Sequence, residues 1–301
     1  AKDVYSYPAA IAAAPDSALA LFHELKRRGL QPTVVTYGAT IKACLRKSGD
    51  SRSGDSARLD AALELLTEMR DALEEEPDIR LYGAMVSAFQ KAGRWRQALD
   101  LFEAMQQRHP SAKPSLATYA SAIAACAKSG DTSSKRALEI FRDLKRHRRP
   151  NVVAYNAIIS ACRNDWKMAF ELFDDLQIKH DLEPDVVTYV ALLRAFVEGG
   201  RCDLAFEFFA EMKQQGGDLA PNLHAYHAML SACEKTGQLD KAFELFKELQ
   251  RLKPNLITYT VMISTCLAAG QATRALELVD DVQRRFRGCL DVVAYGAMIS
   301  A

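Results

Sequence analysis

Apolar residues recur along this chain with the spacing of an α-helix. In the stretch 155–162 they fall at Tyr155, Ile158, Ile159 and Cys162, and the stretch 226–233 repeats the same spacing. Positions three, four and seven residues apart share one face of a helix. A second apolar pattern follows, a small alanine with large apolar neighbours, as in "AFELF" at 169–173 and 242–246. Short glycine-containing breaks such as "KTGQ" (235–238) separate the two patterns, which predicts pairs of antiparallel amphipathic helices.

The pattern repeats along the whole chain. Its anchor tyrosine recurs at Tyr7, Tyr37, Tyr82, Tyr119, Tyr155, Tyr189, Tyr226, Tyr259 and Tyr295, and six of the eight intervals measure 33 to 37 residues. This period predicts an all-α solenoid of helix-pair repeats, about eight units plus a partial ninth, forming a single domain over residues 1–301. The 45-residue interval contains "KSGDSRSGDS", which predicts a loop insertion around 47–56. The 30-residue first interval predicts a shortened first helix.

The junctions between units share a proline followed by a short polar residue. These polar residues are Thr33, Asp78, Ser115, Asn151, Asp185, Asn222 and Asn255. Proline cannot continue the preceding helix. The side chain after it can accept a hydrogen bond from a free N–H of the next helix, which contributes about 0.5–2 kcal/mol. We therefore expect each of these residues to be a helix N-cap.

Composition narrows the function. The chain has 49% hydrophobic residues and 39 basic against 38 acidic side chains, so it can build a large core but carries no strong positive field. No run of about eighteen apolar residues appears, so we expect no membrane insertion. The chain opens without a leader and its last residues, "DVVAYGAMISA", stop inside the repeated pattern. We interpret it as a segment of a longer protein.

The cysteines and histidines do not predict a metal site. Five of the seven cysteines lie seven residues after an anchor tyrosine: Cys44, Cys126, Cys162, Cys233 and Cys266. Each occupies the same apolar position in a different repeat, where free cysteine packs as a small hydrophobe. His224 and His227 are a single pair without further ligands. We expect no metal, no cofactor, no catalytic residue and no small-molecule substrate.

The repeat resembles that of the pentatricopeptide repeat family. The resemblance rests on "P-[DN]-V-V-T/A-Y-x-A-[ILM]-[IL]-S-A-C", the following "A-[LF]-E-L-F" and tails such as "EMKQQG" (211–216), and it covers essentially the whole chain. Tetratricopeptide repeats would instead carry a tryptophan and a Leu-Gly pair in the first helix. The family implies a right-handed superhelical solenoid that binds single-stranded RNA along its first helices, one base per repeat. The zinc deaminase signature of some plant members does not occur in this sequence.

The resemblance also implies which residues read bases. The main readers are the residue after the anchor tyrosine and the last residue of the unit, here Asn156 with Asp185, and Thr260 with Asp291. The first pair would favour uracil and the second guanine. Aliphatic residues two before the anchor would pack against the base: Val153, Val187, Ile257 and Val293.

The other reader pairs depart from the family's pattern. They begin with Pro8, Gly38, Gly83, Ala120, Val190 and His227, and five of these six supply no side-chain donor. Lysine or arginine nine residues after the anchor would contact phosphate, and Arg46, Lys91, Lys128 and Lys235 hold that position.

Two functions follow from the resemblance. The first is a single-stranded RNA-binding protein in organellar RNA processing, stability or translation. The alternative is a scaffold or structural subunit of a large organellar assembly, such as a ribosome or membrane complex, that binds mainly protein or folded RNA. RNA binding is the preferred function, and the near-neutral charge, the few complete reader pairs and the insertion at 47–56 are the points that support the alternative. The organelle, mitochondrion or plastid, is implied by the family alone.

Overall fold

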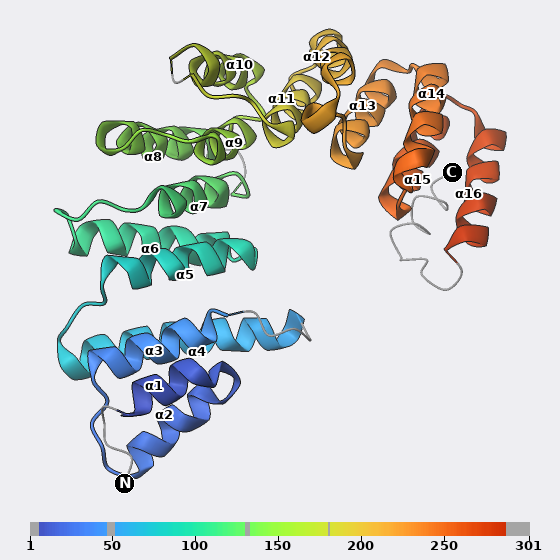
Figure 1. The fold of residues 1–301 in the computed structure, drawn as a ribbon. Helices are drawn as coiled ribbons and strands as arrows, with labels where there is room; N and C mark the ends of the chain where they lie inside the picture. The colour runs from blue at the N-terminus through green and yellow to red at the C-terminus, as the bar shows by residue number, and fades with distance from the viewer. Residues whose placement is uncertain (1–5, 47–51, 130–132, 180, 287–301) are drawn as a thin grey trace. The chain divides into compact units, whose positions relative to one another are not determined.

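The computed structural model describes residues 6–46, 52–129, 133–179 and 181–286, and these residues form helices and short connections without any strand. Two compact units divide the chain at Pro150, residues 1–150 and residues 151–301, and each is described by itself. Figure 1 shows the succession of helices. The all-α helix-pair fold expected from the repeat is confirmed in each unit. One uninterrupted domain over residues 1–301 stays a prediction.

Unit 1 contains α1 (Ser6–Ala13), α2 (Ala18–Arg27), α3 (Val34–Cys44), α4 (Arg52–Leu73), α5 (Ile79–Lys91), α6 (Trp95–Arg108), α7 (Leu116–Cys126) and α8 (Ser133–His147). A 3₁₀ turn at Pro15–Ser17 joins the first two. Odd-numbered helices are the first helices of their repeats, and each packs against its own second helix and against a neighbouring first helix. Within the described residues α1 has 8 residues, against 11 to 13 in α3, α5 and α7. Residues 1–5 lie outside the described part, so a shortened first helix in this repeat stays a prediction.

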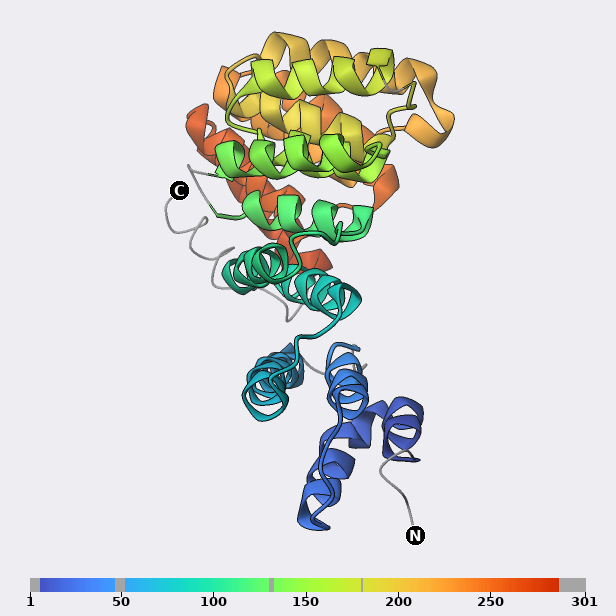
Figure 2. The same ribbon diagram turned by 90° about the vertical axis from the view of Figure 1, so that its left-hand side faces the viewer.

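Unit 2 contains α9 (Val152–Ala161), α10 (Trp166–Asp174), α11 (Val186–Glu198), α12 (Cys202–Gln215), α13 (Leu223–Thr236), α14 (Leu239–Leu249), α15 (Leu256–Ala268) and α16 (Ala272–Arg285). A π-helical turn, Asp175–Lys179, extends α10, and 3₁₀ turns lie at Gly217–Leu219 and Gln250–Leu252. The first helices α9, α11, α13 and α15 contact one another in that order, and Figure 2 shows the helices of unit 2, coloured from yellow-green to red, from a second side.

The anchor tyrosines form the core between repeats. Tyr119 is fully buried, and its ring lies 5.8 Å from that of Phe102, which ends the apolar pattern of the preceding second helix. Tyr259 packs in the same way against Phe246 at 5.3 Å. Edge-to-face aromatic contacts contribute beyond the area they bury. The two sequence patterns therefore recur together because the phenylalanine of one repeat packs on the tyrosine of the next.

Six of the anchor tyrosines also donate a hydrogen bond from the hydroxyl group to a carboxylate. The donor–acceptor pairs are Tyr37–Glu68, Tyr119–Asp143, Tyr155–Asp175, Tyr189–Glu211, Tyr226–Glu248 and Tyr259–Asp281, at 2.5 to 3.0 Å. In each pair the carboxylate comes from the second helix of the same repeat or from the turn that extends it. A buried phenol needs a partner for its hydroxyl, so this bond fixes the pairing of the two helices.

The predicted N-caps are all confirmed. The cap oxygens accept hydrogen bonds from the backbone N–H three residues on: Thr33 from Thr36, Asp78 from Leu81, Ser115 from Thr118, Asn151 from Ala154, Asp185 from Thr188, Asn222 from Ala225, and Asn255 from Thr258. The cap residues have extended backbones, as N-caps require. Every first helix from α3 to α15 therefore begins at the residue that the junction pattern predicts.

One part of the sequence prediction is wrong. A loop was expected over 47–56, but α4 begins at Arg52 and runs for 22 residues, while residues 47–51 lie outside the described part. Serine and aspartate are as favourable in the first turn of a helix as in a loop. The insertion thus lengthens the second helix of this repeat and does not serve only as a loop between the two helices.

The five repeated cysteines are buried, as expected from their apolar positions. Burial raises the pKa of the Cys126 and Cys233 thiols to about 11. None of the helices formed by the described residues combines the length and apolar character that crossing a membrane requires.

Candidate nucleic-acid interface

A row of aliphatic side chains stands exposed on the first helices. Val153 is 61% exposed, Val187 56% and Ile257 61%, and all three lie two residues before an anchor tyrosine. Val35 holds the same position on α3 and is 67% exposed. Large aliphatic side chains at such exposure leave apolar surface for a ligand to cover. The positions expected to pack against bases are therefore accessible in these repeats, and Val293 lies outside the described residues.

Asn156 and Asp185 are brought together, as their pairing in the sequence predicts. Asn156 lies on α9, and its Nδ2 donates a hydrogen bond to Oδ1 of Asp185, the N-cap of α11, at 2.9 Å. The Thr188 hydroxyl lies 2.6 Å from Oδ1 of Asn156 and 2.9 Å from Oδ1 of Asp185. A hydroxyl has one proton, so Thr188 donates to only one of these oxygens at a time. The three side chains form one polar cluster.

The cluster keeps hydrogen-bonding capacity for a ligand. Asn156 is 8% exposed, and one of its two amide protons is used by Asp185. Asp185 is exposed, and its cap bond and side-chain bonds all use Oδ1. An N–H of Asn156 and Oδ2 of Asp185 remain as neighbouring donor and acceptor. A base edge that presents an acceptor beside a donor matches this pair, and uracil has such an edge.

Thr260 offers a ligand fewer hydrogen-bonding groups than the sequence predicts. Its hydroxyl donates to the carbonyl oxygen of Leu256 within α15, at 3.0 Å. This bond occupies the single hydroxyl proton, so Thr260 faces a ligand as an acceptor. Its expected partner, Asp291, lies outside the described residues.

Three reader positions are buried and hold residues without a polar side chain. Ala120 is 7% exposed and Val190 8%, and Gly83 is also buried. A Cβ added to Gly83 would lie 2.5 Å from the Thr118 hydroxyl oxygen. The absence of a side chain at Gly83 therefore allows α5 and α7 to approach each other. The reader residues of these three repeats therefore carry no side-chain donor or acceptor for a base edge.

His227 forms a polar pair with Thr258. Its Nε2 lies 2.8 Å from the Thr258 hydroxyl, in the same arrangement that joins Asn156 to Thr188. Burial lowers the pKa of His227, and the neighbouring His224 and Arg194 lower it further. The neutral imidazole can donate from one nitrogen and accept at the other.

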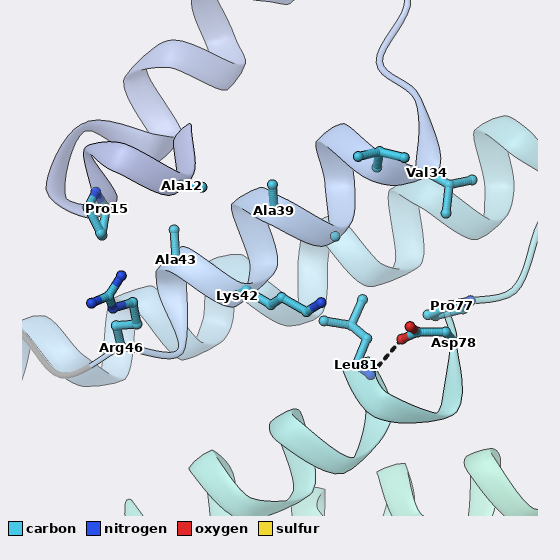
Figure 3. A pocket seen from close by; sticks show the side chains of 12 residues that line it. Ala12, Pro15, Val34, Ala39, Lys42, Ala43, Arg46, Pro77, Asp78 and Leu81 are labelled. Atoms are coloured by element: carbon cyan, nitrogen blue, oxygen red, sulfur yellow. Dashed lines mark hydrogen bonds between the residues drawn. The ribbon is translucent and has the colours of Figure 1, made fainter. Parts of the chain in front are cut away.

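Gly38 has a different environment from Gly83, although both occupy the same place in their repeats. A Cβ on Gly38 would meet only the Leu81 side chain, at 4.0 Å. A pocket of about 430 Å³ opens here between α1, α3 and α5, lined by Val35, Gly38, Ala39 and Leu81 among others. Figure 3 shows Lys42 extending along this pocket toward Leu81 and the Asp78 cap. The pocket offers an apolar wall, a carboxylate and a cation in one place.

The four predicted phosphate contacts are all exposed and all lie at the C-terminal ends of first helices. They are Arg46, Lys91, Lys128 and Lys235. Lys235 donates to the carbonyl oxygen of Val197 at 3.0 Å, which holds its ammonium beside the end of α11. Cations at helix C-termini also interact favourably with the helix dipole. Across the described part of the chain, no three His, Cys, Asp or Glu side chains gather as a metal ion would require.

Comparison with known proteins decides the family. Residues 105–291 match the profile of the pentacotripeptide-repeat region of PRORP, residues 80–109 that of the PPR repeat, and residues 3–47 that of the pentatricopeptide repeat domain. The chain belongs to the pentatricopeptide repeat family. The resemblance expected from the repeated residues is thereby confirmed.

Several relatives of this pentatricopeptide repeat protein are known. A mitochondrial 15S rRNA processing factor of Yarrowia lipolytica is 30% identical over 165 residues, which cover 53% of this chain and 20% of that protein. A mitochondrial pentatricopeptide repeat-containing protein of Arabidopsis thaliana is 26% identical over 204 residues, covering 65% and 39%. The crystal structure of the pentatricopeptide repeat protein PPR10 from maize matches with a TM-score of 0.69 and 25% identity, covering 99% and 41%. The chain thus spans less than half the length of these proteins.

One functional position of this pentatricopeptide repeat chain was missed from the sequence. The residue just before the anchor tyrosine is a buried threonine in four repeats, at Thr36, Thr118, Thr188 and Thr258. Three of these hydroxyls lie against the reader position of the preceding repeat. The recurring "TY" was a visible signal, but a threonine before a core tyrosine is equally typical of a helix's first turn.

Proposed function

We propose that this chain binds single-stranded RNA along its first helices and acts in organellar RNA processing, stability or translation. The observation that carries the proposal is the pair of exposed aliphatic side chains beside the Asn156–Asp185 cluster. Val153 and Val187, 61% and 56% exposed, stand on the same two helices as the donor and acceptor. An aliphatic surface that covers a base face, next to a polar pair that meets its edge, is what reading one base per repeat requires.

The relatives support the process and the compartment. The Yarrowia lipolytica relative is named a mitochondrial rRNA processing factor, and the Arabidopsis thaliana relative is named mitochondrial. We propose a mitochondrial or plastid location for this chain on that ground. We assign RNA binding and no reaction to this segment.

Base preference at one repeat gives the sharpest test. With Asn156 and Asp185 as the pair, we expect RNA selected from a random pool to carry uracil at one position. The substitution Asn156→Thr recreates the Thr260-type pair beside the same aspartate and is expected to change the selected base at that position to guanine. Val190→Thr is the matched control, because it places the same side chain at the reader position of the next repeat, where the paired residue is Asn222 and not an aspartate.

The result that would refute the proposed readout is a selected sequence that Asn156→Thr leaves unchanged, or that Val190→Thr changes to the same extent. Binding must also weaken as salt increases, because each neutralised phosphate of a single strand releases about 0.7 counterion. Affinity independent of salt would exclude phosphate contacts by the basic residues.

A scaffold role is the second candidate, and one observation favours it. The reader positions Gly83, Ala120 and Val190 are buried. Three repeats, the first two of them adjacent in the sequence, therefore offer no reading side chain. Purification from cells in a stable protein complex, together with no detectable RNA affinity at low salt, would favour the scaffold and refute the RNA proposal.

A further inference from the structure

A cavity rich in basic side chains lies between the second and third repeats of unit 1. It measures about 900 Å³ and separates the C-terminal end of α3 from that of α5, with the start of α4 beside it. Lys42, Arg46, Lys91 and Arg94 line it, and we call it the basic cavity. Hydroxyl groups of Ser56 and Ser87 add polar lining, and none of the described residues that line it is acidic.

Among the described residues, three of the four cations that line the basic cavity form no ion pair. Arg94 forms a close ion pair with Asp60. Lys42, Arg46 and Lys91 form no ion pair within the described residues. The helix dipole accounts for a single cation at each helix end, but three like charges that face one cavity repel one another. Their arrangement is favourable when an anion occupies the space between them.

The basic cavity adjoins the pocket at Gly38. Lys42 and Arg46 line both spaces, and Figure 3 shows the two side chains on the α3 side of the Gly38 pocket. That pocket has the exposed Val35 as a wall and the Asp78 carboxylate at its rim. Asp78 uses Oδ1 to cap α5, which leaves Oδ2 as an acceptor. A planar base fits the apolar pocket while its phosphate reaches the cations.

We propose that the basic cavity binds the terminal phosphate of an RNA strand, with the terminal base in the Gly38 pocket. A phosphodiester inside the strand carries one negative charge. A terminal phosphomonoester carries about −1.5 to −2 at pH 7 and has three acceptor oxygens, which matches a cavity lined by Lys42, Arg46 and Lys91 better. The inference rests on the proposed RNA binding, and it adds that this site distinguishes a strand end from the interior of a strand.

Binding measurements on internally labelled RNAs that differ only in their end groups test the site. One RNA sequence is prepared with a 5′-phosphate, with a 3′-phosphate and with hydroxyl groups at both ends, and fluorescence anisotropy measures the Kd of each. We expect the protein to prefer one phosphorylated form over the hydroxyl form by about tenfold, the size of one additional charge-assisted contact. In the double variant Lys42→Gln/Lys91→Gln this ratio is expected to approach one.

Lys235→Gln is the matched control, because Lys235 holds the position of Lys91 in a repeat of unit 2. It is expected to weaken all three RNAs equally and to keep their ratio. Equal affinity for the three RNAs, or a ratio that the double variant retains, would overturn the inference while leaving RNA binding intact. No affinity for any RNA would overturn the proposed function as well. Competition by inorganic phosphate as strong as by a phosphorylated RNA end would show a simple phosphate site and overturn the role of the strand.

Discussion

Two glycines at equivalent positions should respond to alanine in opposite ways. Gly38→Ala replaces a residue that disfavours a helix interior and gains roughly 0.5–1 kcal/mol. Its new Cβ meets only the Leu81 side chain, at 4.0 Å, which is ordinary contact. Gly83→Ala has the same helical gain, but its Cβ would lie 2.5 Å from the Thr118 hydroxyl oxygen.

The clash at Gly83 has no inexpensive relief. Thr118 is 4% exposed, and its hydroxyl lies 2.9 Å from that of Ser115, the N-cap of α7. Overpacking a core costs about 1–3 kcal/mol, and disturbing the cap costs about 1 kcal/mol more. We therefore expect Gly38→Ala to stabilise the protein and Gly83→Ala to destabilise it, with a difference of roughly 2–4 kcal/mol from those same contributions.

Urea midpoints of the two variants measure the overall effect, and hydrogen exchange of the α7 amides measures the local one, since repeats can open separately. Thr118→Ala in the Gly83→Ala background removes the clashing oxygen and leaves a Cβ contact of 3.7 Å. The double variant should therefore recover part of the loss, as a coupling energy in a mutant cycle. Equal shifts for Gly38→Ala and Gly83→Ala, or no recovery in the double variant, would refute the packing argument.

Three further predictions concern ionisable groups. Burial alone would raise the pKa of Glu248, but the hydrogen bonds from Lys213 and Tyr226 outweigh it and lower the pKa. The stability that this carboxylate contributes is therefore present above pH 4.5 and is lost as the pH falls through the lowered pKa. Glu248→Gln should make the urea midpoint depend less on pH in the acid range, and an unchanged pH dependence would contradict this. Because burial lowers the pKa of His227, an NMR titration should give a midpoint below about 6.5, and a midpoint at or above it would be inconsistent with the buried imidazole. Burial raises the pKa of Cys233 to about 11, so its alkylation at pH 8 should proceed only after unfolding, and rapid labelling of the native protein would show that the thiol is accessible.

The helix pattern and its boundaries could be predicted because local chemistry determines them. Asp78 and Asn255 each cap a helix by accepting a hydrogen bond from the free backbone N–H three residues ahead. This bond depends only on neighbouring residues in the sequence. The carboxylate partner of the anchor tyrosine was harder to predict. It lies 22 residues after Tyr189 but 24 after Tyr119 and 20 after Tyr155. The spacing varies because the first helices differ in length, 10 residues in α9 against 13 in α11, and the connections after them differ as well.

The openness of each reader position could not be predicted, because it depends on how closely the next helix approaches. Gly38 and Gly83 are the same residue at the same place in the repeat. The first borders a pocket, and the second lies against Thr118. Periodicity identifies which face of a helix points inward but carries no distance between helices, so accessible and closed positions look alike in the sequence.

The two roles of Asp185 determine which substitution can test RNA reading. Its Oδ1 caps α11 and accepts from Asn156, so Asp185→Ala would remove the cap together with any contact to a base. Loss of a cap costs about 0.5–2 kcal/mol, and weaker RNA binding by that variant would not separate reading from folding. Asn156 makes no cap. Its replacement by threonine leaves the Asp185–Thr188 bonds in place, so a changed base preference can be attributed to the base contact.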